Sequence, residues 1–154
     1  MKRSVLKYIK THREEVVSGA ALGEDCAVLS FGEGYETVLS TTPVTAAAER
    51  ISTYAIPMAL NNVAAAGAEP VGVMLTVLLP EETEESGLQL MMEQAEEVCR
   101  GCGTQILGGH TEVTPAVDRP LMTVTGVGKR EAVRAGSLRG IREEQDIVVS
   151  KWIG

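Results

Sequence analysis

A short stretch of the chain, Ile-Leu-Gly-Gly-His-Thr-Glu-Val, joins a pliable backbone to side chains that can do chemistry. Gly108 and Gly109 follow two apolar residues, and His110, Thr111 and Glu112 come next. Glycine has no Cβ and adopts backbone angles that other residues avoid, so main-chain N–H groups at consecutive glycines can converge on an anion. The order predicts a strand and then a turn, which is either a phosphate cradle or a plain Gly-Gly hairpin between two strands.

The same stretch offers ligands for a metal ion. His110 and Glu112 can reach one ion as a mixed nitrogen and oxygen site, with Asp25 joining them from across the sheet. The other histidine, His12, lies in a segment with little hydrophobic pattern, and we interpret it as a surface residue. A transition-metal site at His110 is therefore an alternative to the phosphate site.

Cys99 and Cys102 form a C-x-x-C pair. Such a pair is a redox pair, half of a metal site, or simply two small apolar residues that close a helix. The chain has no second C-x-x-C and no nearby histidine pair to complete four ligands, and three cysteines are too few for a secreted disulfide framework. We favour the helix-closing interpretation.

The composition is typical of one soluble domain with an acidic surface. The 154 residues are 44% hydrophobic, 23% charged and only 3% aromatic, so Val, Leu, Ile, Met and Ala must form the core. The net charge of −7 argues against nucleic acid or an anionic membrane as a partner, because both require a basic surface. No window approaches the roughly 20 apolar residues of a membrane span, and we expect a cytoplasmic protein.

Hydrophobic periodicity predicts the elements that must position these groups. Pro57 interrupts the first helical stripe and predicts a kink or a late first turn, and Gly67 ends that stripe. The acidic run after Pro80 favours the first turn of a second helix. The expected order is strands 25–31 and 37–42, helix 47–66, strand 71–79, a helix from 81 to about 101, strand 104–107 with strand 121–128 as its partner, and a strand beginning at 146.

Asn62 lies on the apolar stripe of the first predicted helix. A buried amide must be hydrogen-bonded. This side chain therefore either satisfies backbone groups or faces a ligand.

Four blocks of small and polar residues stand in order along the chain. They are Gly-Glu-Asp-Cys-Ala-Val-Leu at 23–29, Ser-Thr-Thr at 40–42, Asn-Asn-Val-Ala-Ala-Ala-Gly-Ala-Glu-Pro at 61–70 and Leu-Gly-Gly-His-Thr at 107–111. Together they resemble the N-terminal domain of the aminoimidazole ribonucleotide synthetase superfamily, over about residues 20–150. That superfamily includes the purine enzyme itself, the hydrogenase maturation protein HypE, thiamine-monophosphate kinase and selenophosphate synthetase.

The resemblance implies an α+β domain that binds ATP, with a mixed sheet of about four to six strands and helices on one face. It also implies a homodimer in which two sheets pair into a barrel, in agreement with the strand edges that a lone domain of this size would leave open. In the family pattern, aspartates of the four blocks gather Mg²⁺ and, through it, the ATP phosphates. The implied cofactor-binding positions are Asp25, Thr42, Asn62, Gly108, Gly109, His110 and Thr111, and the implied metal positions are Glu24, Asp25 and His110.

The chain departs from the family where the family has aspartates. The family blocks read Gly-Asp-Asp, Ser-Thr-Asp, Asn-Asp and Gly-Gly-Asp-Thr, whereas here Asp25 alone remains, with Glu24 beside it. Thr42, Asn62 and His110 stand at the other three positions. Selenophosphate synthetases also carry Gly-Gly-His in the last block, so His110 is compatible with an active enzyme. The loss of about three negative charges predicts weak Mg²⁺ binding.

Three functions are compatible with this pattern. The chain belongs to an enzyme that uses ATP to phosphorylate or activate a carbonyl- or carboxamide-type substrate with a reduced metal set, to a nucleotide-binding module without turnover, or to a dimerisation domain that kept only the fold. We favour the first, a HypE-like protein with a maturation-protein partner. We expect an arm or short helix at 1–20, the ATP-binding, dimerising domain at 21–145, and at 146–154 the start of a second domain that would hold the acceptor site and the residues acting on it.

Overall fold

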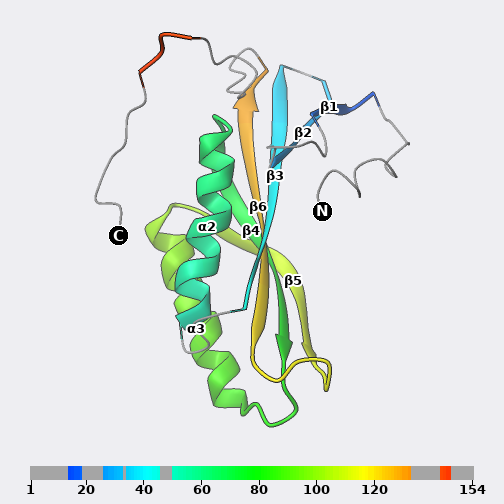
Figure 1. The fold of residues 1–154 in the computed structure, drawn as a ribbon, viewed down its shortest axis with the longest axis vertical. Helices are drawn as coiled ribbons and strands as arrows, with labels where there is room; N and C mark the ends of the chain where they lie inside the picture. Colours follow the sequence, from blue (N-terminus) through cyan, green and yellow to red (C-terminus); the bar gives the residue numbers. More distant parts are fainter. Residues whose placement is uncertain (1–13, 19–25, 33, 46–49, 133–142, 147–154) are drawn as a thin grey trace.

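The computed structural model describes residues 14–18, 26–32, 34–45, 50–132 and 143–146. They form one six-stranded mixed sheet with two helices on one of its faces (Figure 1). The predicted α+β fold is therefore confirmed. The elements are β1 (Val16–Ser18), β2 (Cys26–Ser30), β3 (Tyr35–Val44), α2 (Ile51–Ala65), β4 (Glu69–Leu79), α3 (Glu85–Gly101), β5 (Gln105–Val113) and β6 (Leu121–Glu131).

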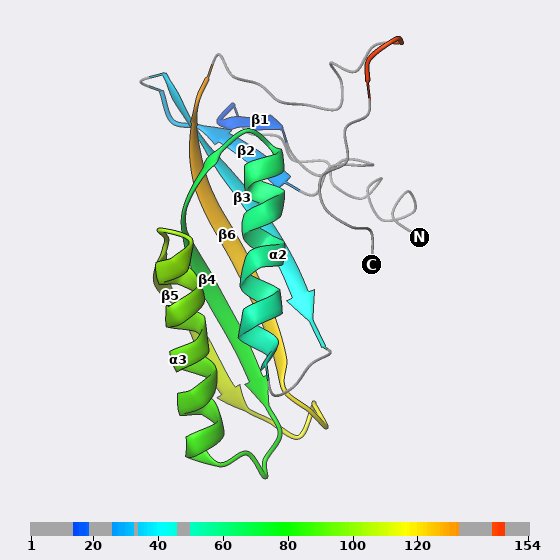
Figure 2. The same ribbon diagram turned by 90° about the vertical axis from the view of Figure 1, so that its left-hand side faces the viewer.

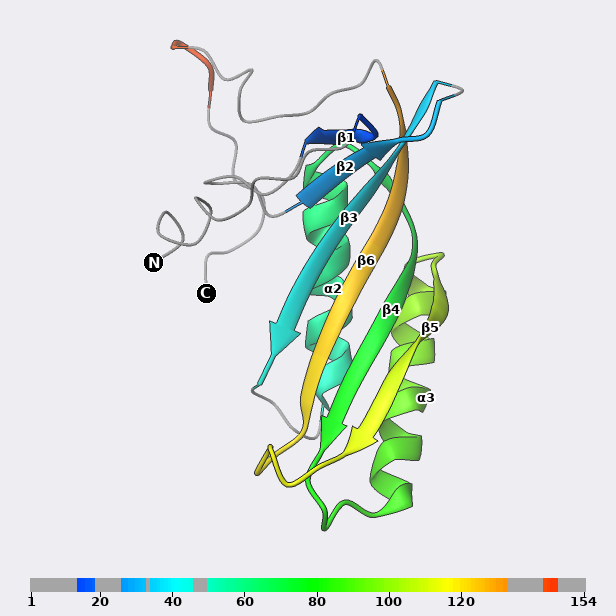
Figure 3. The same cartoon turned by 90° about the vertical axis from the view of Figure 1, so that its right-hand side faces the viewer.

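The strands lie side by side in the order β1-β2-β3-β6-β4-β5. Neighbouring strands are antiparallel except for β4 and β5, which are parallel and are connected by α3. In Figure 2, α2 lies over β3 and β6, and α3 lies over the β4–β5 side. Figure 3 looks onto the opposite face, which neither of these helices covers. We call it the open face.

The main core lies between the helices and the sheet, and strand alternation builds it. In β4 every second residue from Val73 to Leu79 is buried against the helices. In α3 the buried residues Met91, Ala95 and Cys99 join this core, and burial of Cys99 raises the pKa of that thiol. The buried residues of the main core are Val44, Ile51, Ala55, Ile56, Ala59, Leu60, Val73, Leu75, Val77, Leu79, Met91, Ala95, Cys99, Met122 and Val124.

Helix α2 packs directly on the backbone of β6, because two glycines of that strand leave room for it. A Cβ on Gly126 would lie 3.1 Å from the carbonyl oxygen of Ala59. A Cβ on Gly128 would collide with the side chain of Val63 and lie 2.8 Å from the carbonyl oxygen of Glu69. These small residues bring the C-terminal half of α2 close to the sheet.

The C-terminal end of α2 is fixed by local hydrogen bonds, as Gly67 predicts. Gly67 has a φ of 77°, its N–H donates to the carbonyl of Ala64 at 2.9 Å, and the N–H of Ala68 donates to Val63 at 3.3 Å. This pattern is a Schellman motif, which favours glycine at its left-handed position. Helix α2 starts at Ile51 and holds Pro57 in its interior, so the late first turn, one of the two alternatives predicted at Pro57, does not occur.

Two other local predictions are wrong, and two concern segments that lie largely outside the described residues. The strand predicted at 104–107 continues to Val113, and it pairs with β4 rather than with residues 121–128, because β4 lies between β5 and β6. Only Glu85 of the acidic run lies in the first turn of α3. The predicted arm or short helix at 1–20 is described only at 14–18, where Val16–Ser18 form β1. The strand expected from 146 lies outside the described residues apart from Asp146 itself.

Candidate functional site

The glycine pair lies inside β5 and forms neither a phosphate-cradling turn nor a hairpin. Gly108 and Gly109 have φ values of 149° and 155° and pair with Met74 and Leu75 of β4. A Cβ on Gly109 would overlap the carbonyl oxygen of Leu75. The close backbone approach that the sequence predicts at this glycine is therefore an approach to the neighbouring strand.

His110 and Glu112 lie together at the edge of the open face. Their side chains are 68% and 53% exposed, and His110 Nε2 lies 3.8 Å from Glu112 Oε2. His110 is opposite Thr76, and Thr111 is opposite Val77. The described residues contain no group of three histidine, cysteine, aspartate or glutamate side chains that could hold a metal ion. The third ligand of the predicted metal site, Asp25, lies outside the described residues, as does Glu24.

A second polar group lies where α2 meets β2 and β3. Asn62 Nδ2 donates to Ser40 Oγ at 3.1 Å and to Thr42 Oγ1 at 3.4 Å. The thiol of Cys26 donates to the backbone carbonyl of Asn62 at 3.3 Å, and Cys26 is the cross-strand partner of Ser40. We call Cys26, Ser40, Thr42 and Asn62 the α2–β3 cluster. The Asn62 amide is thus satisfied by hydroxyl groups of a neighbouring strand.

The α2–β3 cluster brings together three of the four sequence blocks that point to ATP. Cys26 belongs to the first block, Ser40 and Thr42 to the second, and Asn62 to the third. Its hydroxyl and amide groups can hydrogen-bond phosphate oxygens. Mg²⁺ prefers carboxylate ligands, and the cluster contains none. These four residues alone therefore do not form a magnesium site.

The fourth block does not join the α2–β3 cluster within one chain. The strand register places Thr42, Val124, Leu75 and Gly109 in one row across the sheet, so Thr42 and Gly109 are three strand spacings apart, about 14 Å. Thr42 faces α2, whereas His110, the next residue after Gly109, faces the open side. One ligand cannot contact Thr42 and His110 of the same protomer.

A buried ion pair near the C-terminal end of α2 is absent from the sequence predictions. Arg130 Nε lies 2.7 Å from Glu36 Oε2, and the two side chains are 6% and 8% exposed. Arg130 Nη1 also donates to the carbonyl of Ala66 at 2.7 Å. The signal was the strand period, because Glu36 is in phase with the buried Val38 and therefore faces the core.

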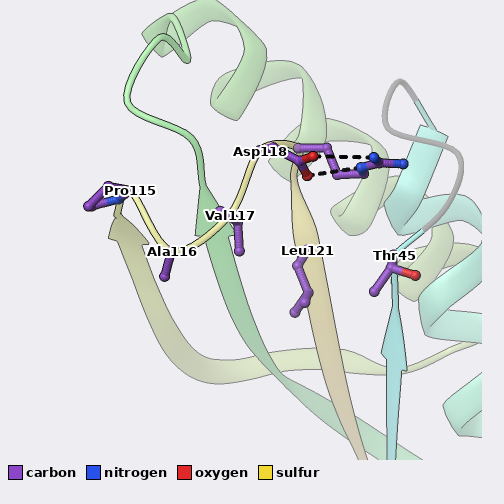
Figure 4. Close-up of a pocket in the computed structure, with 7 residues that line it drawn as sticks. Thr45, Pro115, Ala116, Val117, Asp118 and Leu121 are labelled. Carbon is purple, nitrogen blue, oxygen red and sulfur yellow. Dashed lines mark hydrogen bonds and ion pairs between the residues drawn. The ribbon is translucent and has the colours of Figure 1, made fainter.

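A cavity of about 370 Å³ lies under the loop between β5 and β6 (Figure 4). It is lined by Thr45, Pro115, Ala116, Val117, Asp118, Arg119 and Leu121. The Arg119 side chain hydrogen-bonds Asp118 and lowers the pKa of that carboxyl, and both groups are exposed. None of the predicted site residues lines this cavity.

The cysteines of the C-x-x-C pair are free and differ in exposure. Cys99 is buried in α3, whereas Cys102 follows the helix and is exposed. This arrangement agrees with the helix-closing interpretation.

The sequence matches one protein family over most of its length. Residues 23–130 match the family model for the AIR synthase related protein, N-terminal domain. A hydrogenase expression/formation protein of Methanocaldococcus jannaschii is 26% identical over 104 residues, which are 68% of this chain and 31% of that protein. The thiamine-monophosphate kinase of Bacillus subtilis is 24% identical over 136 residues, 82% of this chain and 41% of the kinase.

Solved structures of HypE share the fold. HypE in complex with ATP has a TM-score of 0.61 and 25% identity, covering 72% of this chain and 35% of HypE. HypE in the HypE–HypF complex has a TM-score of 0.60 and 25% identity, covering 69% and 36%. The chain spans about a third to two fifths of the length of the curated relatives that it matches. Neither helix of the described residues is long and apolar enough to cross a membrane.

Proposed function

Because this chain belongs to the family of AIR synthase related proteins, whose N-terminal domain it matches, we propose that it binds ATP at the α2–β3 cluster. The observation that carries the proposal is a pair of hydrogen bonds that join the second and third sequence blocks. Asn62 Nδ2 donates to Ser40, 22 residues earlier in the sequence, and to Thr42, 20 residues earlier. The likeness to HypE, solved with ATP, supports the choice of nucleotide.

The chemistry of the cluster predicts weak binding. Asn62 lies in the last turn of α2, where the helix dipole is negative and does not attract phosphate. The attraction must come from hydroxyl and amide donors, which are weaker than charged ones. The described residues of the cluster add no carboxylate for Mg²⁺, so ATP affinity should depend little on that ion.

In the whole protein, ATP bound here would phosphorylate or activate a carbonyl- or carboxamide-type substrate. The similarity to a hydrogenase expression/formation protein and to HypE supports a role of this kind in hydrogenase maturation. HypE has been solved in a complex with HypF, which supports a maturation protein as partner. Asp25 and Glu24 stay as the proposed metal ligands of the same chain, and His110 can join the nucleotide only from a second copy of the chain.

A second function, nucleotide binding without turnover, is favoured by one observation. Thr42 and Asn62, which stand at two family aspartate positions, hydrogen-bond each other and leave the cluster neutral. Phosphoryl transfer needs a cation to neutralise charge in the transition state. Slow or absent ATP hydrolysis by the full-length protein, together with measurable ATP binding, would favour this alternative.

Calorimetric titration with ATP tests the site. We expect Asn62→Ala and Thr42→Val to raise the Kd at least fivefold, because each removes a polar group of the cluster. Thr37→Val is the matched control, since Thr37 lies on the same strand and faces the open side. An unchanged Kd in both cluster variants would exclude this site. Binding by the wild type that a chelator abolishes would contradict the expected independence of Mg²⁺.

A further inference from the structure

The buried ion pair links two cross-strand partners near the start of β3 and the end of β6. Glu36 of β3 is directly opposite Arg130 of β6, and both face the helix side. A buried ion pair is weak evidence for stability, because desolvation of the two charges offsets most of their attraction. Its presence between the helices and the sheet therefore calls for another reason.

The guanidinium group of Arg130 also contacts α2. Its Nη1 donates to the carbonyl of Ala66, the residue that caps the helix, while its Nε is held by Glu36. A guanidinium group is planar and has its donors in a fixed fork, so these two bonds set the helix end at one distance and angle from β3 and β6. The contacts that Gly126 and Gly128 make with α2 are apolar or steric and have no such direction.

Asn62 is joined to this helix end by a backbone hydrogen bond. The N–H of Ala66 donates to the carbonyl of Asn62 at 3.1 Å, so the two residues lie one helical turn apart and are joined directly. The Asn62 side chain reaches Ser40 and Thr42 at 3.1 and 3.4 Å, the second near the upper limit of a hydrogen bond. A small shift of α2 along β3 would break these contacts.

We propose that Arg130 and Glu36 are positioning residues that hold Asn62 in register with Ser40 and Thr42. The functional part of this inference rests on the proposed ATP site, whereas the geometric part does not. Neither residue touches the cluster, and both act through the C-terminal cap of α2. The pair thus selects one placement of the helix, which apolar packing alone would leave less defined.

The test replaces the whole pair, so that no buried charge is left alone. In the double variant Glu36→Leu/Arg130→Met, apolar side chains of similar volume take the place of the ions. We expect a melting temperature within a few degrees of the wild type and an ATP Kd raised at least fivefold. The side-chain amide resonances of Asn62, observed in the ¹⁵N-labelled 154-residue chain without nucleotide, should shift.

A second variant covers the case in which the double variant does not fold. Arg130→Lys keeps a cation beside Glu36 but has one ammonium group in place of the fork, so it cannot hold Glu36 and Ala66 with the same geometry. We expect the same shift of the Asn62 resonances and a raised Kd. Leu79→Ala is the control, because it destabilises the main core at the far end of β4.

The outcomes separate positioning from stability. Raised Kd and shifted Asn62 resonances in the pair variants, with both unchanged in Leu79→Ala, support the proposal. Unchanged Asn62 resonances in the pair variants overturn it, and so does an equal loss of ATP affinity in Leu79→Ala. If the wild type binds no ATP, the proposed function fails, and the Asn62 resonances alone then decide whether Arg130 and Glu36 position this side chain.

Discussion

At Gly109 the absence of one carbon atom permits two strands to pair. A Cβ there would overlap the carbonyl oxygen of Leu75, whereas a Cβ on Gly108 would meet nothing within 4 Å. Both glycines have backbone angles that strain an L side chain. We therefore expect Gly108→Ala to cost about 1–3 kcal/mol of unfolding free energy and Gly109→Ala more, about 3 kcal/mol or above, in urea denaturation.

The comparison of the two glycine variants isolates the collision from the strain. If both variants lose the same free energy, the contact with Leu75 contributes nothing beyond backbone strain. Because neither glycine lies near the α2–β3 cluster of its own chain, a loss of ATP affinity in a folded variant would indicate that this block joins the nucleotide from a second copy of the chain.

Single residues of the candidate site were predictable when their type conflicted with their place in a pattern. Asn62 stands out as an amide on an apolar helical stripe, and it does have hydrogen-bond partners, although these are the hydroxyl groups of Ser40 and Thr42 rather than the backbone groups that the sequence predicts as one alternative. Glu36 and Arg130 stand at buried strand positions in the same way, but their partnership joins residues 94 apart and no local pattern indicates it. The sequence spacing also gives no sign that Thr42 and His110 face opposite sides of the sheet.

At the scale of elements, Gly67 decides how α2 ends. Its φ of 77° belongs to the left-handed region, where any residue with a Cβ is strained. We expect Gly67→Ala to lower the unfolding free energy by about 1–2 kcal/mol. Gly101→Ala is the matched control, because Gly101 ends α3 with no positive φ and open space around it, and there alanine should be neutral or stabilise by up to about 1 kcal/mol. Equal effects in the two variants would contradict the role of the cap.

Periodicity predicted the helices and most strands, because each of these elements carries its own hydrophobic repeat. It failed at β5, since Gly108 and Gly109 are typical of turns and nothing local shows that β4 requires a residue without a Cβ there. It also failed on the neighbour of β5. A parallel pair joined by a helix depends on packing between distant segments, and two strands adjacent in sequence are not always adjacent in the sheet.

At the scale of the whole molecule, the open face is the surface on which a second copy is expected. Met74 lies there and is 49% exposed, and Met58, on the outer side of α2, is 48% exposed. We predict that Met74→Arg shifts the protein from dimer to monomer in sedimentation at tens of micromolar, because a buried unpaired charge opposes association. Met58→Arg, with the same exposure on the opposite side, should stay dimeric. A wild-type monomer at this concentration would contradict the prediction of a homodimer.

The molecule has a second, smaller core, and the α2–β3 cluster rests on it. That core consists of Val28, Val38, Val63 and Ala68, with Cys26 and Ala66 packed against it. Local opening costs less free energy where less apolar surface is buried, so amide hydrogens of β2 should exchange with solvent before those of β4 and β6. A ligand that bridges α2 and β3 binds only the closed form and slows this exchange. Ligand binding at the cluster would therefore be detected as slower amide hydrogen exchange in β2.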